Sequence, residues 1–375
     1  MRALRALLFV LLLGLVVSAG LAAATQLGHG LEETGKSRPV YWSAFIASLL
    51  FFTGIGHGAA WVALWATQRK RPAVLPAAAL MAFLAPAVGG LNPLLHLGRP
   101  QLFYFTMIAP QPRSPLFWDM VLVQLFAGVA FLLILLLIAP GMVAKIAPRL
   151  RSASERLQSL IPLVAVAAAV LALAAEVVAS WILTMTRNPM WSSPLHLPTA
   201  LGGALAGGLA LVALGQLALG QGAEAARRMG GPLLAAATLA FLCGATEHAL
   251  AAFSADAAVG AVLWSKLNGA YATPFWTMAA LTFLLPLLLL ARPSGRSPRA
   301  VGAAAFLFLV GLWLERWVGI VATLSHPRLA MWTGTTALTG SEVRIVLGEA
   351  ALVALGFALL ARLLPRPEWR PEPIG

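Results

Sequence analysis

The sequence predicts an all-α integral membrane protein with about ten transmembrane helices, arranged as two tandem four-helix bundles flanked by one helix at each end. Of its 375 residues, 60% are hydrophobic and only 10% are charged, and the mean hydropathy is +0.86. Soluble domains carry about 25% charged residues, so this composition excludes an ordinary soluble enzyme. No apolar run alternates with polar residues as a barrel strand would, so the spans are helical.

Ten apolar runs are each long enough for the roughly 20 residues that a transmembrane helix needs. Basic residues, prolines and glycines mark their ends. In order they cover 3–25, 41–67, 74–95, 116–139, 159–186, 198–220, 231–254, 270–292, 299–323 and 343–365. These runs divide the chain into an N-terminal helix and outer loop (1–40), a first bundle (41–190), a second bundle (191–335), and a C-terminal helix with its tail (336–375).

The basic residues predict the orientation of the spans. They gather at the N-terminus and in every second loop: Arg2, Arg5, Arg69, Lys70, Arg71, Lys145, Arg149, Arg151, Arg156, Arg227, Arg228, Arg292, Arg296, Arg299, Arg362, Arg366 and Arg370. Cytoplasmic loops of membrane proteins are rich in Lys and Arg, so both termini are expected in the cytoplasm of an inner-membrane protein. The net charge of +13 is then orientation charge, and no nucleic-acid partner is expected.

The first span has two interpretations. Its basic start, apolar middle and small residues Ala22, Ala23 and Ala24 also describe a signal peptide. We favour a retained helix, and the orientation of the later spans is the same in either case. The single cysteine, Cys243, excludes a disulfide framework and a cysteine-ligated iron–sulfur cluster within this chain.

An internal repeat relates the two bundles. GIGHGAAWVAL at 54–64 is similar to ALAGGLALVAL at 204–214, so that Gly58 corresponds to Gly208. SPLFW at 114–118 is similar to TPFW at 273–276, and the stretches that begin at Glu176 and Glu315 both reach a threonine eight residues later. Each copy contains four spans, and an even number makes the copies parallel, related by an axis along the membrane normal.

Ionisable residues within membrane spans are costly and indicate functional sites. In the first bundle they are His57, Asp119 and Glu176, with His96, Arg99 and the aromatic Tyr104 at or beyond the outer end of the third span. In the second they are Glu247, His248, Glu315 and Arg316, and the last span adds Glu349. The first group could bind a quinone, whose redox chemistry requires groups that donate hydrogen bonds and exchange protons.

Purely structural roles are alternatives for each of these residues. Asp119 could pair with Arg99 or Arg113, and Glu176 and Glu315 could be satisfied by Thr184 and Thr323. His57 could be a packing residue in a glycine-rich contact between helices. Glu247 and His248 could pair with each other, and Arg316 is the simplest partner for Glu315.

A more specific signal is the run LHLGRP at 95–100, followed by FYF at 103–105 and SPLFWD at 114–119. Together with FFTGIGHGAAW at 51–61, these motifs resemble the polysulfide reductase membrane-subunit (NrfD/PsrC) family. The resemblance is strong over about 41–139 and weaker to about 323. The ten-span arrangement is similar to that of the membrane subunits of alternative complex III and of sulfite-reductase-associated complexes.

This resemblance implies a quinone-reactive membrane subunit of a respiratory oxidoreductase complex, which is not catalytic alone. Menaquinone or ubiquinone would exchange electrons with a ferredoxin-like iron–sulfur subunit on the outer face, behind which lies a molybdopterin enzyme or a multihaem cytochrome. No haem or metal is expected in this chain. By motif, His96, Arg99 and Asp119 are carried over to the quinone site, with His96 and Asp119 as its catalytic pair.

The remaining site residues are assigned by their depth in the membrane. His57, Glu176 and Tyr104 join the quinone site, and Glu247, Glu315 and Glu349 are candidates for a proton route. Three other functions stay open. The chain could carry a b-type haem on His57 and His248, act as a secondary transporter with an unwound segment at Pro86, Gly89 and Gly90, or serve as a scaffold without quinone.

Overall fold

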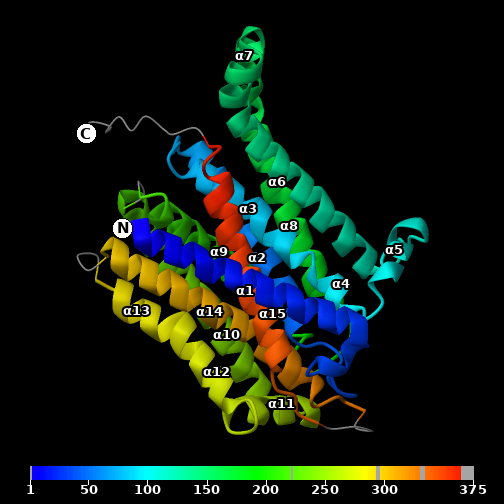
Figure 1. Cartoon of the computed structure of the whole chain (residues 1–375). Helices are drawn as coiled ribbons and strands as arrows, with labels where there is room; N and C mark the ends of the chain where they lie inside the picture. The colour runs from blue at the N-terminus through cyan, green and yellow to red at the C-terminus, as the bar shows by residue number, and fades with distance from the viewer. Residues whose placement is uncertain (1, 221–222, 293–295, 330–333, 365–375) are drawn as a thin grey trace.

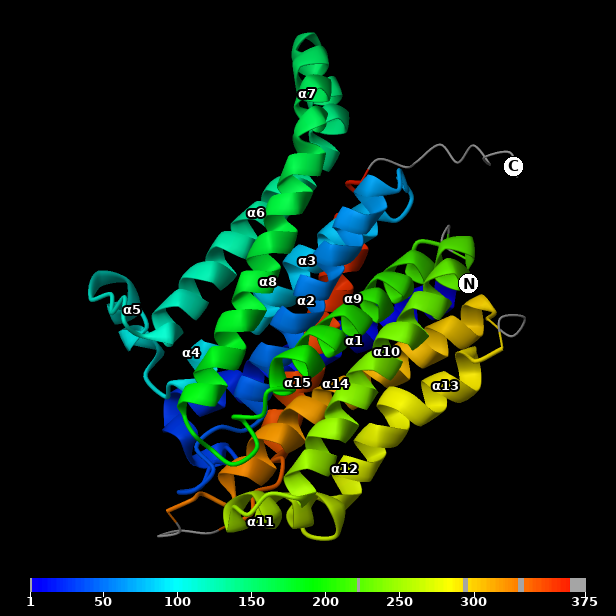
Figure 2. The same cartoon turned by 180° about the vertical axis from the view of Figure 1, so that it is seen from behind.

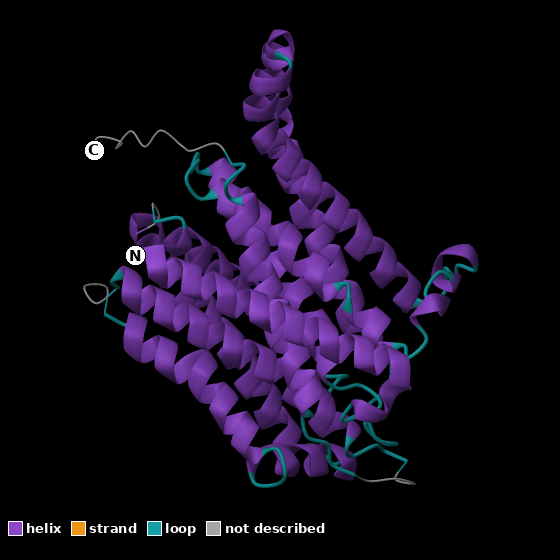
Figure 3. Ribbon diagram, viewed as in Figure 1, coloured by secondary structure: helices purple, strands orange, loops and turns teal. Residues whose placement is uncertain are grey.

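The computed structural model describes residues 2–220, 223–292, 296–329 and 334–364, and within these ranges the regular structure is entirely helical (Figure 3). Ten stretches of the described chain are long and apolar enough to cross a membrane. The prediction of an all-α, ten-span protein is therefore confirmed. Arg366 and Arg370 of the predicted cytoplasmic tail lie outside the described residues.

The long helices follow the predicted spans closely. They are α1 (Arg2–His29), α2 (Ala44–Gln68), α3 (Leu75–Gly89), α6 (Pro115–Ile146), α8 (Ile161–Met185), α9 (His196–Ala218), α10 (Ala223–Ala252), α14 (Pro298–Leu324) and α15 (Gly340–Leu360). The eighth span is α12 (Ala272–Ala279), a π-helical turn (Ala280–Leu284) and α13 (Leu285–Leu290) in succession. This turn packs against Gly311 of α14, where a side chain would meet Leu281 and Thr282.

Four short helices were not predicted from the sequence. They are α4 (Asn92–His96), α5 (Phe105–Ile108), α7 (Arg151–Leu157) and α11 (Ala257–Leu267). The expected third span is broken, because α3 ends at Gly89 and α4 starts afresh at Asn92. Pro86 lies inside α3, but α3 ends at Gly89 and Gly90 lies in the break, so the helix is interrupted at the two glycines of the unwound segment that was considered.

The helices pack in two groups that share one interface (Figures 1 and 2). In the first, α2 contacts α3 and α8, and α6 contacts the same two helices. In the second, α9 and α14 pack with each other and with α10, and α10 and α14 pack with the α12–α13 span. Helices α1 and α15 lie side by side, α15 packs on α3, and α2 packs on α9 between the groups.

The contact between α2 and α9 depends on two glycines. A Cβ atom on Gly58 would lie 1.8 Å from the carbonyl oxygen of Ala204, and one on Gly208 would lie 2.1 Å from the carbonyl carbon of Gly58. Both distances are far inside van der Waals contact. The two backbones therefore touch, which only residues without side chains permit.

The ends of the helices divide the loops between two faces. Figure 1 shows helix α7, the α2–α3 turn and the end of α15 on the side where α1 starts, whereas α4, α5 and α11 lie at the opposite end. The first set of loops carries the basic residues of the orientation prediction. We call the opposite end, with α4, α5 and α11, the outer end, as that prediction has it.

Candidate functional site

A cavity of about 400 Å³ lies between the two helix groups. Its wall is mostly apolar, with residues such as Leu49, Phe241 and Leu312. Nine ionisable side chains also line it: His57, Asp119, Glu176, His196, Glu247, His248, Lys266, Glu315 and Arg316. The first three come from α2, α6 and α8, and the others from α9, α10, α11 and α14. The cavity therefore has two polar walls of different composition.

On the first wall, His57 and Glu176 form a buried pair. Nδ1 of His57 lies 2.8 Å from a carboxylate oxygen of Glu176, and the two residues are 2% and 7% exposed. A carboxylate accepts the Nδ1 proton and so fixes the tautomer in which Nε2 is the acceptor. Nε2 itself has no hydrogen-bond partner among the described residues. The ring is held by an edge-on contact with Phe126 at 4.7 Å between centroids.

Asp119 lines the same cavity from the first turns of α6. The described part of the chain contains no ion pair that involves its carboxylate, so the expected bridge to Arg99 or Arg113 does not form. Pro115 starts α6 after the extended Ser114, which places Asp119 one turn into the helix at its outer end. His57, Asp119 and Glu176, predicted together from the sequence, are thus brought together by the structure.

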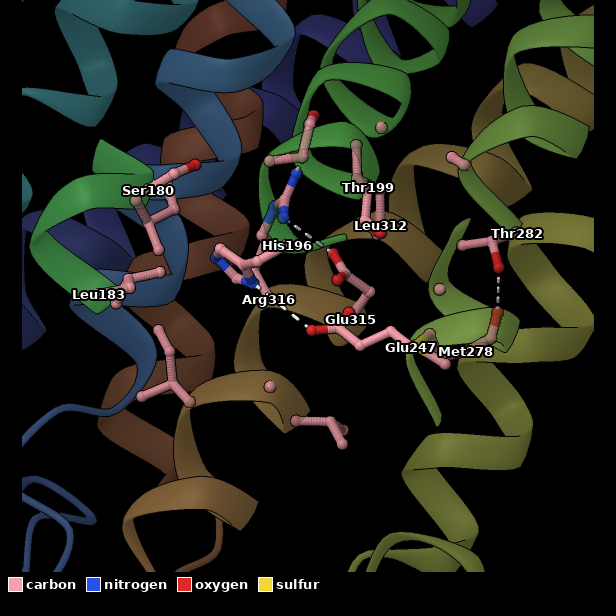
Figure 4. Close-up of a pocket in the computed structure, with 18 of the residues that line it drawn as sticks. Ser180, Leu183, His196, Thr199, Glu247, Met278, Thr282, Leu312, Glu315 and Arg316 are labelled. Carbon is pink, nitrogen blue, oxygen red and sulfur yellow. Dashed lines mark hydrogen bonds and ion pairs between the residues drawn. The ribbon is translucent and has the colours of Figure 1, made fainter. Parts of the chain in front are cut away.

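The second wall carries one ion pair and one contact between a histidine and a carboxyl group. Arg316 lies 3.3 Å from the carboxylate of Glu315, and Nδ1 of His196 lies 4.0 Å from that of Glu247. Figure 4 shows these four side chains converging from three helices. The guanidinium of Arg316 also faces the carbonyl of Ala200 at 3.5 Å. Charges of both signs are therefore held within one desolvated cluster.

Lys266 belongs to this second wall and is 6% exposed. Burial lowers its pKa, while the carboxylates of Glu247 and Glu315 act to raise it. Its Nζ lies 3.7 Å from the sulfur of Met190. The residue sits on α11, between the candidate spans, so it supplies a cation to the cavity from the outer end.

His96, Arg99 and Tyr104 do not line the cavity. Lys36 Nζ lies 2.8 Å from Nδ1 of His96 and donates to its carbonyl oxygen at 2.9 Å. Arg99 and Tyr104 are exposed on the outer surface. The reason is the break after α3: only Leu95 and His96 of the LHLGRP run lie on the short helix α4, and the rest of the run follows in the outer loop. A quinone-site role for these three residues stays a prediction.

Glu349 lies apart from Glu247 and Glu315, so the three candidates for a proton route do not form one cluster. It is only 5% exposed on α15, with Asn92 and Ser48 as its polar neighbours. Neither neighbour meets hydrogen-bond geometry, and both carboxyl oxygens lack a partner within the described structure.

Several structural alternatives can now be settled. Glu176 bonds to His57 and not to Thr184, whose hydroxyl donates to the carbonyl of Ser180. Glu247 faces His196, and Nδ1 of His248 bonds to the carbonyl of Gly244 at 2.7 Å, so the Glu247–His248 pair was wrong. The pairing of Glu315 with Arg316 is confirmed.

Sequence reasoning missed two residues of the cavity, His196 and Lys266. His196 is the first residue of α9 and lies just before the predicted span 198–220. Lys266 lies in the apolar stretch AAVGAVLWSKL, which is too short to be a membrane span. A lone lysine in such a stretch was the available signal, because an unpaired lysine is rarely buried.

The fold and the cavity define a class of protein: multi-pass helical membrane proteins with a polar cavity between two similar helix groups. This class includes redox subunits as well as transporters. The comparison with known families selects among them. The model of the family "Polysulphide reductase, NrfD" matches residues 32–326, which is most of the chain, and the protein belongs to this family.

A relative from Halobacterium salinarum bears the provisional name of a dimethyl sulfoxide reductase membrane subunit. It is 29% identical over 362 residues, which cover 90% of this chain and 81% of the relative. Family and relative together identify the chain as similar to membrane subunits of reductase complexes.

Proposed function

We propose that this protein is the quinone-reactive membrane subunit of a respiratory oxidoreductase complex. The observation that carries the proposal is the His57–Glu176 pair on the lining of a mostly apolar cavity, because the buried Nε2 of His57 has no hydrogen-bond partner among the described residues. A quinone, when bound, supplies two-electron, two-proton redox chemistry. The head group of a quinone is an apolar ring with two polar oxygens. It fits an apolar wall on which Nε2 of His57 has no partner among the described residues.

The size of the cavity agrees with this ligand class. Small-molecule pockets span about 300–1,000 Å³, and this one encloses about 400 Å³. Of the predicted quinone-site residues, we retain His57, Asp119 and Glu176 here, because these three share the lining. The fit therefore rests on residues from three helices of the first group.

The chemistry of the pair follows from its hydrogen bond. Nε2 of His57 can take up a proton, and the carboxylate of Glu176 stabilises the imidazolium that results. Asp119, which has no ion-pair partner among the described residues, provides a second proton acceptor on the same wall. Two acceptors match the two protons that quinol oxidation releases.

The family and the relative support a proposal for the partner subunits. We propose an iron–sulfur subunit docked on the outer end and, because the relative is named for a reductase, a molybdopterin enzyme that receives the electrons. Quinol is then the electron donor, and the membrane is the inner membrane with both termini in the cytoplasm. The basic loops at one end of the molecule support that orientation.

Photoaffinity labelling of the purified complex with an azidoquinone tests the location of the site without relying on activity. We expect label on peptides from α2 or α8, competed by unlabelled quinone. Label confined to residues 92–108 would move the site to His96. An intact complex that takes up no label at all would make the chain a scaffold subunit.

A further inference from the structure

Seven buried side-chain oxygens without a hydrogen-bond partner lie outside the cavity, on or beside α1, α2, α4 and α15. Among the described residues they are Gln26 Oε1, Ser43 Oγ, Asn92 Oδ1, Ser341 Oγ, Glu342 Oε1 and both carboxyl oxygens of Glu349. Helix α15 contacts α1 and α2, and α4 contacts the same two helices. Buried polar groups nearly always have a partner, so these oxygens mark a buried polar region that can accept further hydrogen bonds.

The inner end of this group is Glu349. It lies on α15, beyond residues 32–326 that match the family, and faces Asn92 and Ser48. The hydroxyl of Ser48 already accepts a hydrogen bond from Nε1 of Trp313 at 3.0 Å, which leaves its own proton free to donate. Burying an isolated charge in such surroundings is costly. The neutral, protonated form of the Glu349 side chain is therefore favoured over the carboxylate.

The outer end is an open pocket lined by Lys36 and His96, with Leu31, Ser37, Arg38 and Tyr41. Asn92 and His96 are one helical turn apart on α4, and Glu349 and Glu342 are two turns apart on α15. Glu342 is fully buried and acts electrostatically on Lys36. Polar groups on α4 and α15 therefore extend from the surface pocket to Glu349.

Lys36 is suited to exchange protons at this opening. It lies in the loop between α1 and α2 and is half-buried. Burial lowers its pKa to about 8, against the opposing effect of the Glu342 carboxylate. Its Nζ contacts the imidazole of His96 at 2.8 Å, so an amine and an imidazole, two groups that can exchange protons with water, meet where these polar groups reach the surface.

We propose that these residues form a proton path from the outer surface to Glu349, with Lys36 and His96 as its mouth and Asn92 as its inner positioning residue. Only a proton moves: it is taken from water at the mouth and stored as the O–H of the Glu349 carboxyl. The Asn92 amide orients the intervening hydrogen bonds and stays neutral throughout. The path goes beyond the proposed quinone chemistry and does not depend on it.

Infrared spectroscopy of the purified full-length protein tests the path directly. The C=O stretch of a protonated carboxylic acid should be present in the wild type and absent in Glu349→Gln. On transfer to D₂O this band should shift rapidly. In Asn92→Leu and in Lys36→Met the shift should slow by about tenfold, equivalent to about 1.4 kcal/mol in the barrier.

Glu315→Gln is the matched control, because it removes a carboxyl group from the other cluster and should leave the Glu349 band and its exchange unchanged. A band that persists in Glu349→Gln would overturn the proposal, since Glu349 would then not be the protonated acid. Equally fast exchange in wild type, Asn92→Leu and Lys36→Met would also overturn it. If Asn92→Leu does not fold, Lys36→Met, which changes only a loop side chain, decides the question.

Discussion

The two walls of the cavity offer nine ionisable groups but use them differently. On the wall of α2, α6 and α8, one histidine faces two carboxyl groups, and the described cavity lining holds no lysine or arginine from these helices. On the wall of α9, α10, α11 and α14, two carboxylates are matched by Lys266 and Arg316, with His196 and His248 beside them. In the proposed function the first wall accepts protons, whereas the second wall sets its carboxyl groups beside basic side chains of its own.

The largest effect is expected where the two walls are joined. In Gly58→Ala the new Cβ would meet the carbonyl of Ala204 at 1.8 Å, and overpacking of this kind costs about 1–3 kcal/mol or more. The matched control is Gly128→Ala on α6, where nothing lies within 4 Å of the new Cβ. That change should stabilise by up to about 1 kcal/mol through helix propensity.

Thermal unfolding of both variants in detergent checks this prediction. Gly58→Ala should unfold at a clearly lower temperature than wild type, and Gly128→Ala at the same temperature or slightly higher. If both variants behave alike, the backbone contact between α2 and α9 does not hold the walls together.

The next effect separates the chemistry of the walls. His57→Leu removes the free Nε2, and loss of a general base typically lowers the rate by about 10²–10⁴-fold. We expect quinol oxidation by the assembled complex to fall by that factor, with normal assembly. Thr53→Val is the control on the same wall, because the Thr53 hydroxyl bonds only to the carbonyl of Leu49 at 2.7 Å. Comparable activity of His57→Leu and wild type would transfer the site to another part of the chain.

Arg316→Met examines the second wall by leaving Glu315 without its ion pair. Because Glu315 is about a third exposed, we expect a cost of about 1–3 kcal/mol, below the range for fully buried pairs. The double variant Glu315→Gln/Arg316→Met should recover much of that loss in a double-mutant cycle. The quinol oxidation rate should stay near that of wild type. A large loss of that rate with unchanged stability would mean that both walls take part in the chemistry.

The smallest effect concerns the outer loops of the second group. Nε of Arg328 donates to the carboxylate of Asp256 at 2.7 Å, and this bond, followed by the backbone donor of Ala258, holds the pKa of Asp256 below its usual value. A depressed carboxyl pKa stabilises the fold above about pH 4, the ordinary Asp value, and this contribution disappears as the pH falls through the lower folded pKa.

Asp256→Asn should therefore lower the unfolding temperature slightly at about pH 7, and this difference should shrink as the pH falls below the ordinary Asp value of about 4 toward the lower pKa of the folded state. The pair is exposed, and exposed pairs contribute little. Glu155→Gln breaks another exposed ion pair, that of Glu155 with Arg151. The change in unfolding temperature of this variant shows how much such a pair contributes. A larger effect of Asp256→Asn in acid than at neutral pH would contradict the assignment.

The sequence supports the fold well because membrane spans are defined by local composition. About 20 apolar residues predict a helix whatever the rest of the chain does, and all ten spans were found in this way. The break in the third span was considered only as the unwound segment of the transporter alternative, because the run 74–95 is long enough for a continuous span across Gly90. Helix α11 was missed because it is apolar but too short to span.

The site was only partly predictable, because its contacts join residues far apart in the chain. His57 and Glu176 were both selected as ionisable residues within spans, yet nothing local indicates that residues 119 positions apart form a 2.8 Å contact. The LHLGRP run drew attention to His96, but the short helix α4 pairs that residue with Lys36 instead. A motif identifies a family more securely than it locates the group that does the chemistry.

The touching glycines have a consequence for the symmetry of the molecule. Gly58 and Gly208 occupy equivalent positions in the internal repeat and also contact each other. Equivalent residues of two repeats can touch only where both lie next to the pseudo-two-fold axis that relates the repeats. In the same alignment of the two repeats, His57 corresponds to Gly207 and Asp119 corresponds to Thr277. A duplicated framework thus surrounds the dyad, but one half-site carries these two proton-accepting groups and the other replaces both. If the proposed quinone function holds, the expected stoichiometry is one quinone head group per chain.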